Sequence, residues 1–179
     1  MANADNPLAA FIEAACVPRD SGHASGTLER AEAILAAIGV EASGLPVESY
    51  DLGPGHVYIE AGSADEVASL TPDVGALGRA TKLGVNTFAR EGERWKTRMF
   101  APGAGVVEDP ATGSAAGPLA IHLARHGRIA FGEQIEISQG AEINRPSTLY
   151  ARVEGEGDRI ERVLVGGSAV VVARGEFSL

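Results

Sequence analysis

The sequence of 179 residues has little cysteine, with Cys16 as its one thiol. A single thiol excludes an internal disulfide and any cysteine-rich metal site. The first residues contain no basic stretch followed by an apolar one, so no signal peptide is predicted. No apolar run approaches the length of a membrane span. These absences predict a cytoplasmic protein that has no membrane partner.

Basic residues are also in deficit, with 15 Lys and Arg against 24 Asp and Glu and a formal net charge of −9. A nucleic-acid binder needs a basic surface, so no nucleic-acid partner is predicted. Aromatic residues make up only 5% of the chain, whereas glycine occurs 23 times. This mixture is typical of a turn-rich sheet protein whose loops approach a ligand closely. The hydrophobic content of 45% is sufficient for the core of one ordinary domain or two small ones.

Apolar periodicity and turn signals predict an α+β fold. Helical spacing and capping residues predict helices over residues 27–38, from Ser63 to Leu70, and from Thr71 toward Leu83. Alternation and turn residues predict strands over residues 47–52, 56–60, 84–90, 94–100, 134–138, 148–154, 159–165 and 169–173. The two strands around Glu91-Gly92-Glu93 should form a hairpin, and residues 101–110 should form a loop.

A helix predicted over residues 112–126 is apolar around most of its circumference. A surface helix would have a polar face, so this helix should be enclosed on most sides. Strands are predicted before and after it. The simplest arrangement is therefore a curved antiparallel sheet or partial barrel around a central buried helix.

The segment Glu108-Asp109-Pro110-Ala111-Thr112-Gly113-Ser114 lies where a loop turns into this helix. The first N–H groups of a helix lack intrahelical partners and carry a partial positive charge, so they bind carboxylate or phosphate. Gly113 removes the side chain that would keep a ligand from the backbone, and Ser114 can cap the helix or donate its hydroxyl. Asp109 places a carboxylate beside the same point, where it can accept a hydrogen bond or move a proton. Ordinary helix capping by Thr112 and Ser114 is the alternative interpretation.

Other candidate groups are given structural interpretations. His122 and His126 are four residues apart, but they are expected at a solvated helix end, and no metal site is predicted from the histidines. Cys16 is interpreted as a small core or surface residue rather than a nucleophile. The Gly53-Pro54-Gly55 and Gly166-Gly167 segments are interpreted as turns, because neither opens a phosphate-binding helix.

Three stretches together resemble the phenazine-biosynthesis PhzF family. They are RMFAP at residues 98–102, GVVEDPATGSAAGPLA at 105–120 and ISQGAEINRPS at 137–147. The resemblance covers about residues 24–179 and points toward the phenazine-pathway members. It implies a diaminopimelate epimerase-like fold, in which two similar halves each curve a sheet around a central helix. The active site of that fold lies in the cleft between the halves, where two helix N-termini face each other.

The resemblance also implies an activity. Phenazine members isomerise trans-2,3-dihydro-3-hydroxyanthranilate by acid/base proton transfer, without a metal or an organic cofactor. Asp109 matches the family aspartate that contacts the polar groups of the substrate and helps proton movement, so it is the predicted catalytic residue. Asp109, Thr112, Gly113 and Ser114 are the predicted substrate-binding residues, and the predicted ligand is a small anionic hydroxy or amino acid.

The sequence departs from the family in one respect. The principal acid/base of the family is a glutamate in the N-terminal half, aided by a histidine in a Gly-His-Pro motif, and this sequence contains neither. Residues 1–23 are interpreted as a divergent leader and residues 24–179 as a PhzF-like C-terminal domain without its N-terminal half. The expected partner is a second copy of the chain or a separate N-terminal half. The alternatives are a non-catalytic half-domain that binds a ligand or a partner, and an inactive truncated product.

Overall fold

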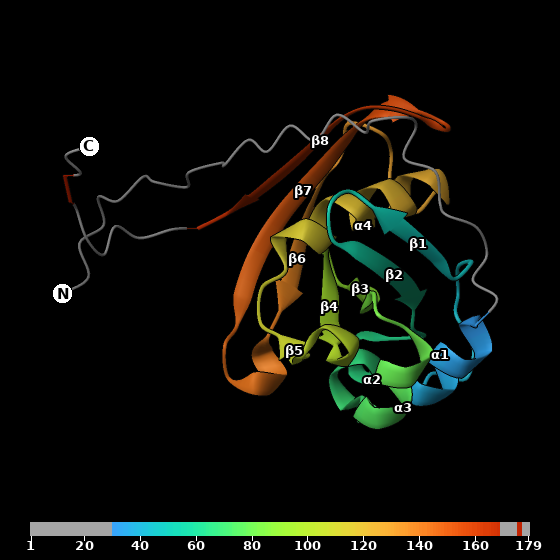
Figure 1. The fold of residues 1–179 in the computed structure, drawn as a ribbon. Coiled ribbons are helices and arrows are strands. Elements are labelled where there is room, and N and C mark those ends of the chain that lie inside the picture. Colours follow the sequence, from blue (N-terminus) through green and yellow to red (C-terminus); the bar gives the residue numbers. More distant parts are fainter. Residues whose placement is uncertain (1–29, 169–174, 177–179) are drawn as a thin grey trace.

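The computed structural model describes residues 30–168 and 175–176, and these form an α+β structure around one strongly curved sheet (Figure 1). The helices are α1 (Ala31–Ile38), α2 (Ala64–Ser69), α3 (Val74–Ala80) and α4 (Gly113–Arg125), with short 3-10 turns at Pro102–Ala104 and Ala141–Ile143. The strands are β1 (Glu48–Asp51), β2 (Gly55–Glu60), β3 (Gly84–Glu91), β4 (Arg94–Ala101), β5 (Val106–Asp109), β6 (Gln134–Gln139), β7 (Ser147–Glu156) and β8 (Arg159–Gly167).

The structure confirms most of the predicted helices and strands, and residues at the helix ends explain where several of them begin or end. Gly39 follows α1 in the left-handed conformation with φ 86°, as expected for a helix terminator. The Ser63 hydroxyl accepts from Glu66 N, although the Glu66 carboxylate accepts from Gly62 N instead of completing a capping box with Ser63. Asp73 caps α3 by accepting from Ala76 N. Thr27 and the strand predicted over residues 169–173 lie outside the described residues.

The sheet is mixed, whereas the sequence predicted an antiparallel one. The strand order is β1-β2-β3-β4-β6-β7-β8, and the β2–β3 and β4–β6 pairs are parallel. The physical reason is that helices separate these strands along the chain: α2 and α3 lie between β2 and β3, and α4 lies between β4 and β6. A crossover helix carries the chain back to the end of the sheet at which the preceding strand began, so the next strand runs parallel to that strand.

Residues 106–109 also differ from the prediction, because they form strand β5 rather than loop. This strand pairs antiparallel with the end of β4, with Met99 opposite Asp109 and Ala101 opposite Val106. A register shift between these two pairs interrupts the ladder. Strand β5 is too short and irregular to show an alternation of apolar and polar residues in the sequence. It forms because the edge of β4 is available for pairing at this point.

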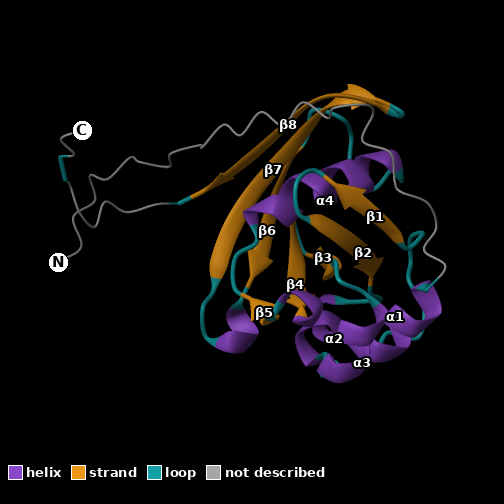
Figure 2. Cartoon of the chain, viewed as in Figure 1, coloured by secondary structure: helices purple, strands orange, loops and turns teal. Residues whose placement is uncertain are grey.

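Helix α4 is enclosed by the sheet, as its apolar circumference predicted. Every residue from Ala115 to Ala124 is buried, and the helix packs against β2, β7 and β8 (Figure 2). Tyr58 donates its hydroxyl to the Ala115 carbonyl at 2.8 Å, which ties β2 to the start of the helix. The fold is therefore a partial barrel around a central helix.

A second core lies on the other face of the same strands. Along β2, Tyr58 belongs to the core around α4, whereas Val57 and Ile59 pack with α1, α2 and α3. This alternation explains why β2 and β3 are buried along both faces. Among the described residues, no helix is long and apolar enough to cross a bilayer.

Candidate functional site

Strand β4 brings the two long sequence motifs together by sharing one of its edges. Its first half pairs with β6, which places Thr97 opposite Gln139. Its second half pairs with β5, which places Met99 opposite Asp109. Asp109 and Gln139 are therefore aligned with β4 residues only two positions apart, although 30 residues separate them along the chain.

Gln139 uses both ends of its side-chain amide to hold the segment that precedes α4. Its Nε2 donates to the Asp109 carbonyl at 2.7 Å and to Thr112 Oγ1 at 3.0 Å. Its Oε1 accepts from Thr112 N at 3.3 Å and from Thr97 Oγ1 at 3.4 Å. Gln139 is 3% exposed, so this network is shielded from water. The glutamine of the downstream motif thus fixes the backbone of the upstream motif.

Gly140 allows this close approach. Its φ of 83° is in the left-handed region, which favours glycine. A Cβ at this position would also lie 2.6 Å from the Pro110 carbonyl oxygen and closer still to the Arg145 carbonyl. Gln139 and Gly140 of the downstream motif therefore support the backbone of residues 109–112.

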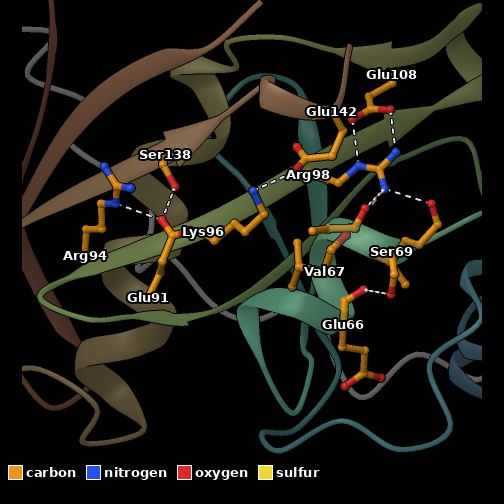
Figure 3. Close-up of polar contacts among 12 residues, drawn as sticks. Glu66, Val67, Ser69, Glu91, Arg94, Lys96, Arg98, Glu108, Ser138 and Glu142 are labelled. Atoms are coloured by element: carbon orange, nitrogen blue, oxygen red, sulfur yellow. Dashed lines mark hydrogen bonds and ion pairs between the residues drawn. The ribbon is translucent and has the colours of Figure 1, made fainter. Parts of the chain in front are cut away.

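An ion pair anchors β5 just before Asp109. Arg98 on β4 donates from Nε and Nη2 to the two carboxylate oxygens of Glu108, each at 2.8 Å. Its Nη1 donates to the Leu70 carbonyl at 2.7 Å, beside the end of α2. Both charged side chains are 9% exposed. Figure 3 shows the guanidinium between Glu108 and the end of α2, so one side chain joins β5 to α2 through β4.

Lys96 on β4, two residues before Arg98, extends the charged network. It forms an ion pair with Glu142, and both side chains are largely buried (Figure 3). Glu142 belongs to the downstream motif, so this contact again joins the two motifs. Arg98, Glu108 and Glu142 thus use their charges to join the motifs to neighbouring elements, which supports the geometry around Asp109.

The N-terminus of α4 is open in front of its first residues. Gly113 and Ser114 are exposed, and a Cβ added at Gly113 would meet no atom within 4 Å. Among the contacts of the described residues, the N–H groups of Gly113 and Ser114 have no acceptor, as is usual for the first positions of a helix. An anion at this point would meet two free donors and the positive end of the helix dipole.

Asp109 and Thr112 lie at the edge of this helix end. Thr112 donates its hydroxyl to Asp109 Oδ2 at 2.6 Å, and its backbone N–H donates to Gln139 Oε1. Thr112 is buried, whereas Asp109 is partly exposed. The structure thus brings the four predicted site residues together, with Thr112 oriented toward Asp109. Direct contact of Thr112 with a ligand stays a prediction.

His56 on β2 is a candidate site residue that the sequence reasoning missed. Its Nε2 lies 3.1 Å from Ser114 Oγ, and its Nδ1 is buried without a partner among the described residues. Burial lowers the pKa of this imidazole, and the negative charge of Asp109 opposes the shift only in part. A neutral imidazole can accept a proton from the serine or orient its hydroxyl.

The sequence does contain a weak signal for His56. It is an ionisable residue at the start of a strand whose next residues, Val57, Tyr58 and Ile59, predict burial. The strand pairing completes the signal, because Gly84 lies opposite His56 and a Cβ there would come within 2.5 Å of its ring. A glycine on β3 therefore leaves the space that the imidazole occupies.

The opposite end of α4 carries a second cluster of ionisable groups. Glu48 Oε2 lies 3.0 Å from His126 Nε2, 3.3 Å from His122 Nδ1 and 2.8 Å from Tyr50 Oη. The prediction of a solvated histidine pair is wrong for His122, which is fully buried. The physical reason is that β1 covers the last turn of α4, so Tyr50 packs its ring against this imidazole.

Burial also controls ionisation in this cluster. It lowers the pKa of His122 to about 4, an effect to which His126 adds, so this imidazole is neutral at physiological pH. Burial raises the pKa of the Glu48 carboxyl, but hydrogen bonds from His126 and Tyr50 outweigh it, so the net shift is downward. The pKa of Tyr50 is raised by burial and by Glu48. The cluster thus combines a carboxylate, a neutral imidazole and a neutral phenol.

Comparison with known proteins identifies the family of the chain. Residues 16–175 match the family model described as phenazine biosynthesis-like protein, PhzC-PhzF. The trans-2,3-dihydro-3-hydroxyanthranilate isomerase of Pseudomonas chlororaphis is 52% identical over 146 residues, which cover 82% of this chain and 52% of the relative. The enzyme of the same name from Pseudomonas fluorescens is 49% identical over 85% of this chain and 55% of the relative. The chain thus spans about half the length of these curated relatives.

Solved structures agree with the sequence match. A PhzF-family phenazine biosynthesis protein from Enterococcus faecalis superposes with a TM-score of 0.63 at 25% identity, covering 89% of this chain and 56% of that one. A predicted epimerase from Pseudomonas aeruginosa gives a TM-score of 0.65 at 29% identity, covering 85% and 54%. The motifs that meet around Asp109, the curved sheet around α4 and these matches lead to one conclusion: the chain belongs to the PhzC-PhzF family of phenazine biosynthesis-like proteins.

Proposed function

We propose that this chain supplies one half of the active site of a PhzF-like isomerase, which moves a proton within a small hydroxy or amino acid. The proposed substrate is trans-2,3-dihydro-3-hydroxyanthranilate or a related acid, because relatives with this named activity are about half identical in sequence. Such an isomerisation removes a proton from one position and returns a proton to another, so it requires acid/base groups rather than an oxidant.

One observation carries the proposal: a free helix N-terminus has a carboxylate and a hydroxyl at its edge. The N–H groups of Gly113 and Ser114 would hold the carboxylate of the substrate. Asp109 would face its hydroxyl or ammonium group, because a second bare anion beside Asp109 would be repelled. Thr112 and Gln139 fix Asp109 and the backbone around it. Asp109 is the proposed catalytic residue, and His56 is a proposed positioning residue for Ser114.

The second wall of the site would come from another polypeptide half. The family resemblance places the principal glutamate acid/base in an N-terminal half, which would face the N-terminus of α4. We therefore expect a heterodimer with such a half, or a homodimer in which two copies face each other. Val106 and Val107 support this expectation, because they are 42% and 60% exposed on β5, next to the site.

Binding and turnover should be measured separately. Calorimetry with the dihydro-hydroxyanthranilate would report binding to the chain alone, and product formation would be followed with and without an added N-terminal half. We expect Asp109→Asn to lower turnover about 100-fold or more, as for loss of an acid/base group. Ser114→Ala should weaken binding by about 1 kcal/mol, as for loss of one hydrogen bond. Asp158→Asn removes a carboxylate that is 97% exposed, so it is the control for charge.

The results separate the proposal from its alternatives. Turnover that appears only with the added half would place the missing acid/base there. Binding without turnover under both conditions would favour a ligand-binding half-domain. If Asp109→Asn and Ser114→Ala both behave like the Asp158→Asn control, residues 109–114 only cap a helix and the proposal fails.

A further inference from the structure

Glu48, His122 and His126 converge at the end of α4 away from Asp109. His122 and His126 lie one helical turn apart and present their rings on the same side, with centroids 4.7 Å apart. Glu48 reaches them from β1, which covers this end of the helix. One oxygen or nitrogen atom from each of the three residues lies within 4.8 Å of the others.

We propose that Glu48, His122 and His126 form a binding site for a zinc-type divalent transition metal ion, which would tie β1 to the end of α4. Two imidazole nitrogens and one carboxylate oxygen are a common ligand set for zinc. The fourth ligand would be water. This site lies apart from the proposed isomerase site, and the ion takes no part in that chemistry.

The interatomic distances suit such an ion. In a tetrahedral site with ligands about 2.0–2.2 Å from zinc, neighbouring ligand atoms are about 3.3–3.6 Å apart. Glu48 Oε2 already lies 3.3 Å from His122 Nδ1 and 3.0 Å from His126 Nε2. The ligand nitrogens of His122 and His126 lie within 4.8 Å of each other. The three side chains would adjust these separations to the tetrahedral value when the ion binds. Binding would move the His126 proton from Nε2 to Nδ1, since Nε2 now donates to the carboxylate.

The surroundings of His122 determine where its ring proton lies. His122 Nε2 is buried and has no hydrogen-bond partner among the described residues. In the metal-free protein Tyr50 donates its proton to Glu48, so His122 Nδ1 faces two acceptor oxygens and carries the ring proton. Binding of an ion at Nδ1 would move this proton to Nε2. Tyr50 donates to Glu48 Oε2 at 2.8 Å and lies 3.1 Å from His122 Nδ1, so it would orient two of the three ligands.

Access and charge are compatible with a bound cation. The Glu48 and His126 side chains are 20% and 22% exposed, so an ion can enter from solvent on their side. His122 lies on the buried side of the cluster. Arg125 is a cation near this cluster, and its guanidinium lies over the Tyr50 ring. Arg125 Nε is 3.6 Å from the exposed Asp158 carboxylate, which offsets part of its charge.

Metal titration of the full chain tests this site. The protein would carry Cys16→Ser, so that no thiol competes, and would have no affinity tag. Zn²⁺ affinity would be measured against a chromophoric chelator, and Co²⁺ would report coordination geometry through its visible absorption. We expect one ion per chain and a tetrahedral Co²⁺ spectrum. His126→Ala and Glu48→Gln should weaken binding by at least about 100-fold, since loss of supporting groups alone reaches this range.

Two further variants make the outcome decisive. His126→Cys retains a zinc ligand, so it should restore binding and add sulfur-to-cobalt charge-transfer bands. His56→Gln removes an imidazole at the other end of α4 and should leave binding unchanged. If the Cys16→Ser chain binds Zn²⁺ no more tightly than His126→Ala, or if His56→Gln lowers affinity as much as His126→Ala does, the proposal is overturned. His126 is partly exposed, so its variants should still fold if Glu48→Gln does not.

Discussion

At the scale of single residues, a few buried side chains fix the geometry of the site. Gln139 is one example, since it satisfies a backbone carbonyl, a backbone N–H and two hydroxyls at once. Arg98 is another, because it links Glu108 to the end of α2. Neither side chain is placed to contact a ligand directly. Their substitution should therefore affect stability and the order of the site together.

Gln139→Ala should lower the free energy of unfolding by about 1–3 kcal/mol, because it leaves buried polar groups without partners. Gln134→Ala is the matched control, since Gln134 is an exposed glutamine on the same strand. It should change stability by no more than about 0.5 kcal/mol. Denaturant unfolding of both variants measures the difference, and equal effects would show that the Gln139 network contributes little.

His56 predicts a pH dependence of stability. Burial depresses its pKa in the folded state below the ordinary value of about 6.5. Below that pH the unfolded chain binds a proton that the folded chain does not, so the free energy of unfolding falls on acidification. This one group contributes a slope of at most about 1.4 kcal/mol per pH unit.

The prediction is that His56→Gln loses less stability than the unmodified chain between about pH 7 and pH 5. Ser114→Ala retains the buried imidazole and should retain the full pH dependence. Urea titrations at several pH values, with a chelator present, give both slopes. A His56→Gln slope equal to that of the unmodified chain would mean that His56 titrates in the folded state as it does in the unfolded one.

At the scale of elements, helix α4 is the centre of the fold because it packs closely against β8. A methyl group added at Gly117 would lie 2.7 Å from Val163 Cγ1 and 3.3 Å from Val165 Cγ2. Valine is stiff at χ1, so it cannot move aside easily. Gly113 is the contrasting position in the same helix, where an added methyl group would meet open space.

Gly117→Ala should therefore destabilise the protein by up to about 2 kcal/mol, since overpacking outweighs the gain of about 1 kcal/mol in helix propensity. Gly113→Ala should be neutral or slightly stabilising. Thermal melts compare the two variants. In a Val163→Ala background the clash is relieved, so Gly117→Ala should then become harmless. A persistent loss in that background would contradict the packing explanation.

At the scale of the whole molecule, the partial barrel has an exposed apolar edge beside its proposed site. Val106 and Val107 lie on β5, immediately before Glu108 and Asp109. Large apolar side chains that are exposed together commonly mark an interface. Val74 is also exposed, at 38%, but it begins α3 and does not belong to β5.

We predict that Val107→Asp weakens association, whether with a second copy or with an N-terminal half, by about tenfold or more, which corresponds to about 1.4 kcal/mol. Val74→Asp introduces the same charge away from the site and should leave association unchanged. Sedimentation equilibrium measures self-association, and titration with an added half measures hetero-association. An unmodified chain that stays monomeric at high concentration, and that binds no N-terminal half, would refute the prediction.

The sequence by itself determined the features that depend on local pattern. The apolar circumference of residues 115–124 predicted a buried helix, and the structure confirms it. A capping serine predicted where α2 begins, and a glycine predicted where α1 ends. The run from Asp109 to Ser114 predicted a helix start bearing polar groups. Each of these signals lies within a few residues, so it is independent of the rest of the chain.

Only the tertiary structure decided which distant residues meet. His56 reaches Ser114 across 58 positions, Gln139 reaches Thr112 across 27, and His126 reaches Glu48 across 78. These contacts depend on strand order and register, including the shared edge of β4 and the two parallel pairs. Periodicity reports which face of an element is buried, but it does not report which other element covers that face. The contacts of His122 with Tyr50 and Glu48 therefore depend on the packing of β1 against the end of α4, which the sequence pattern does not report.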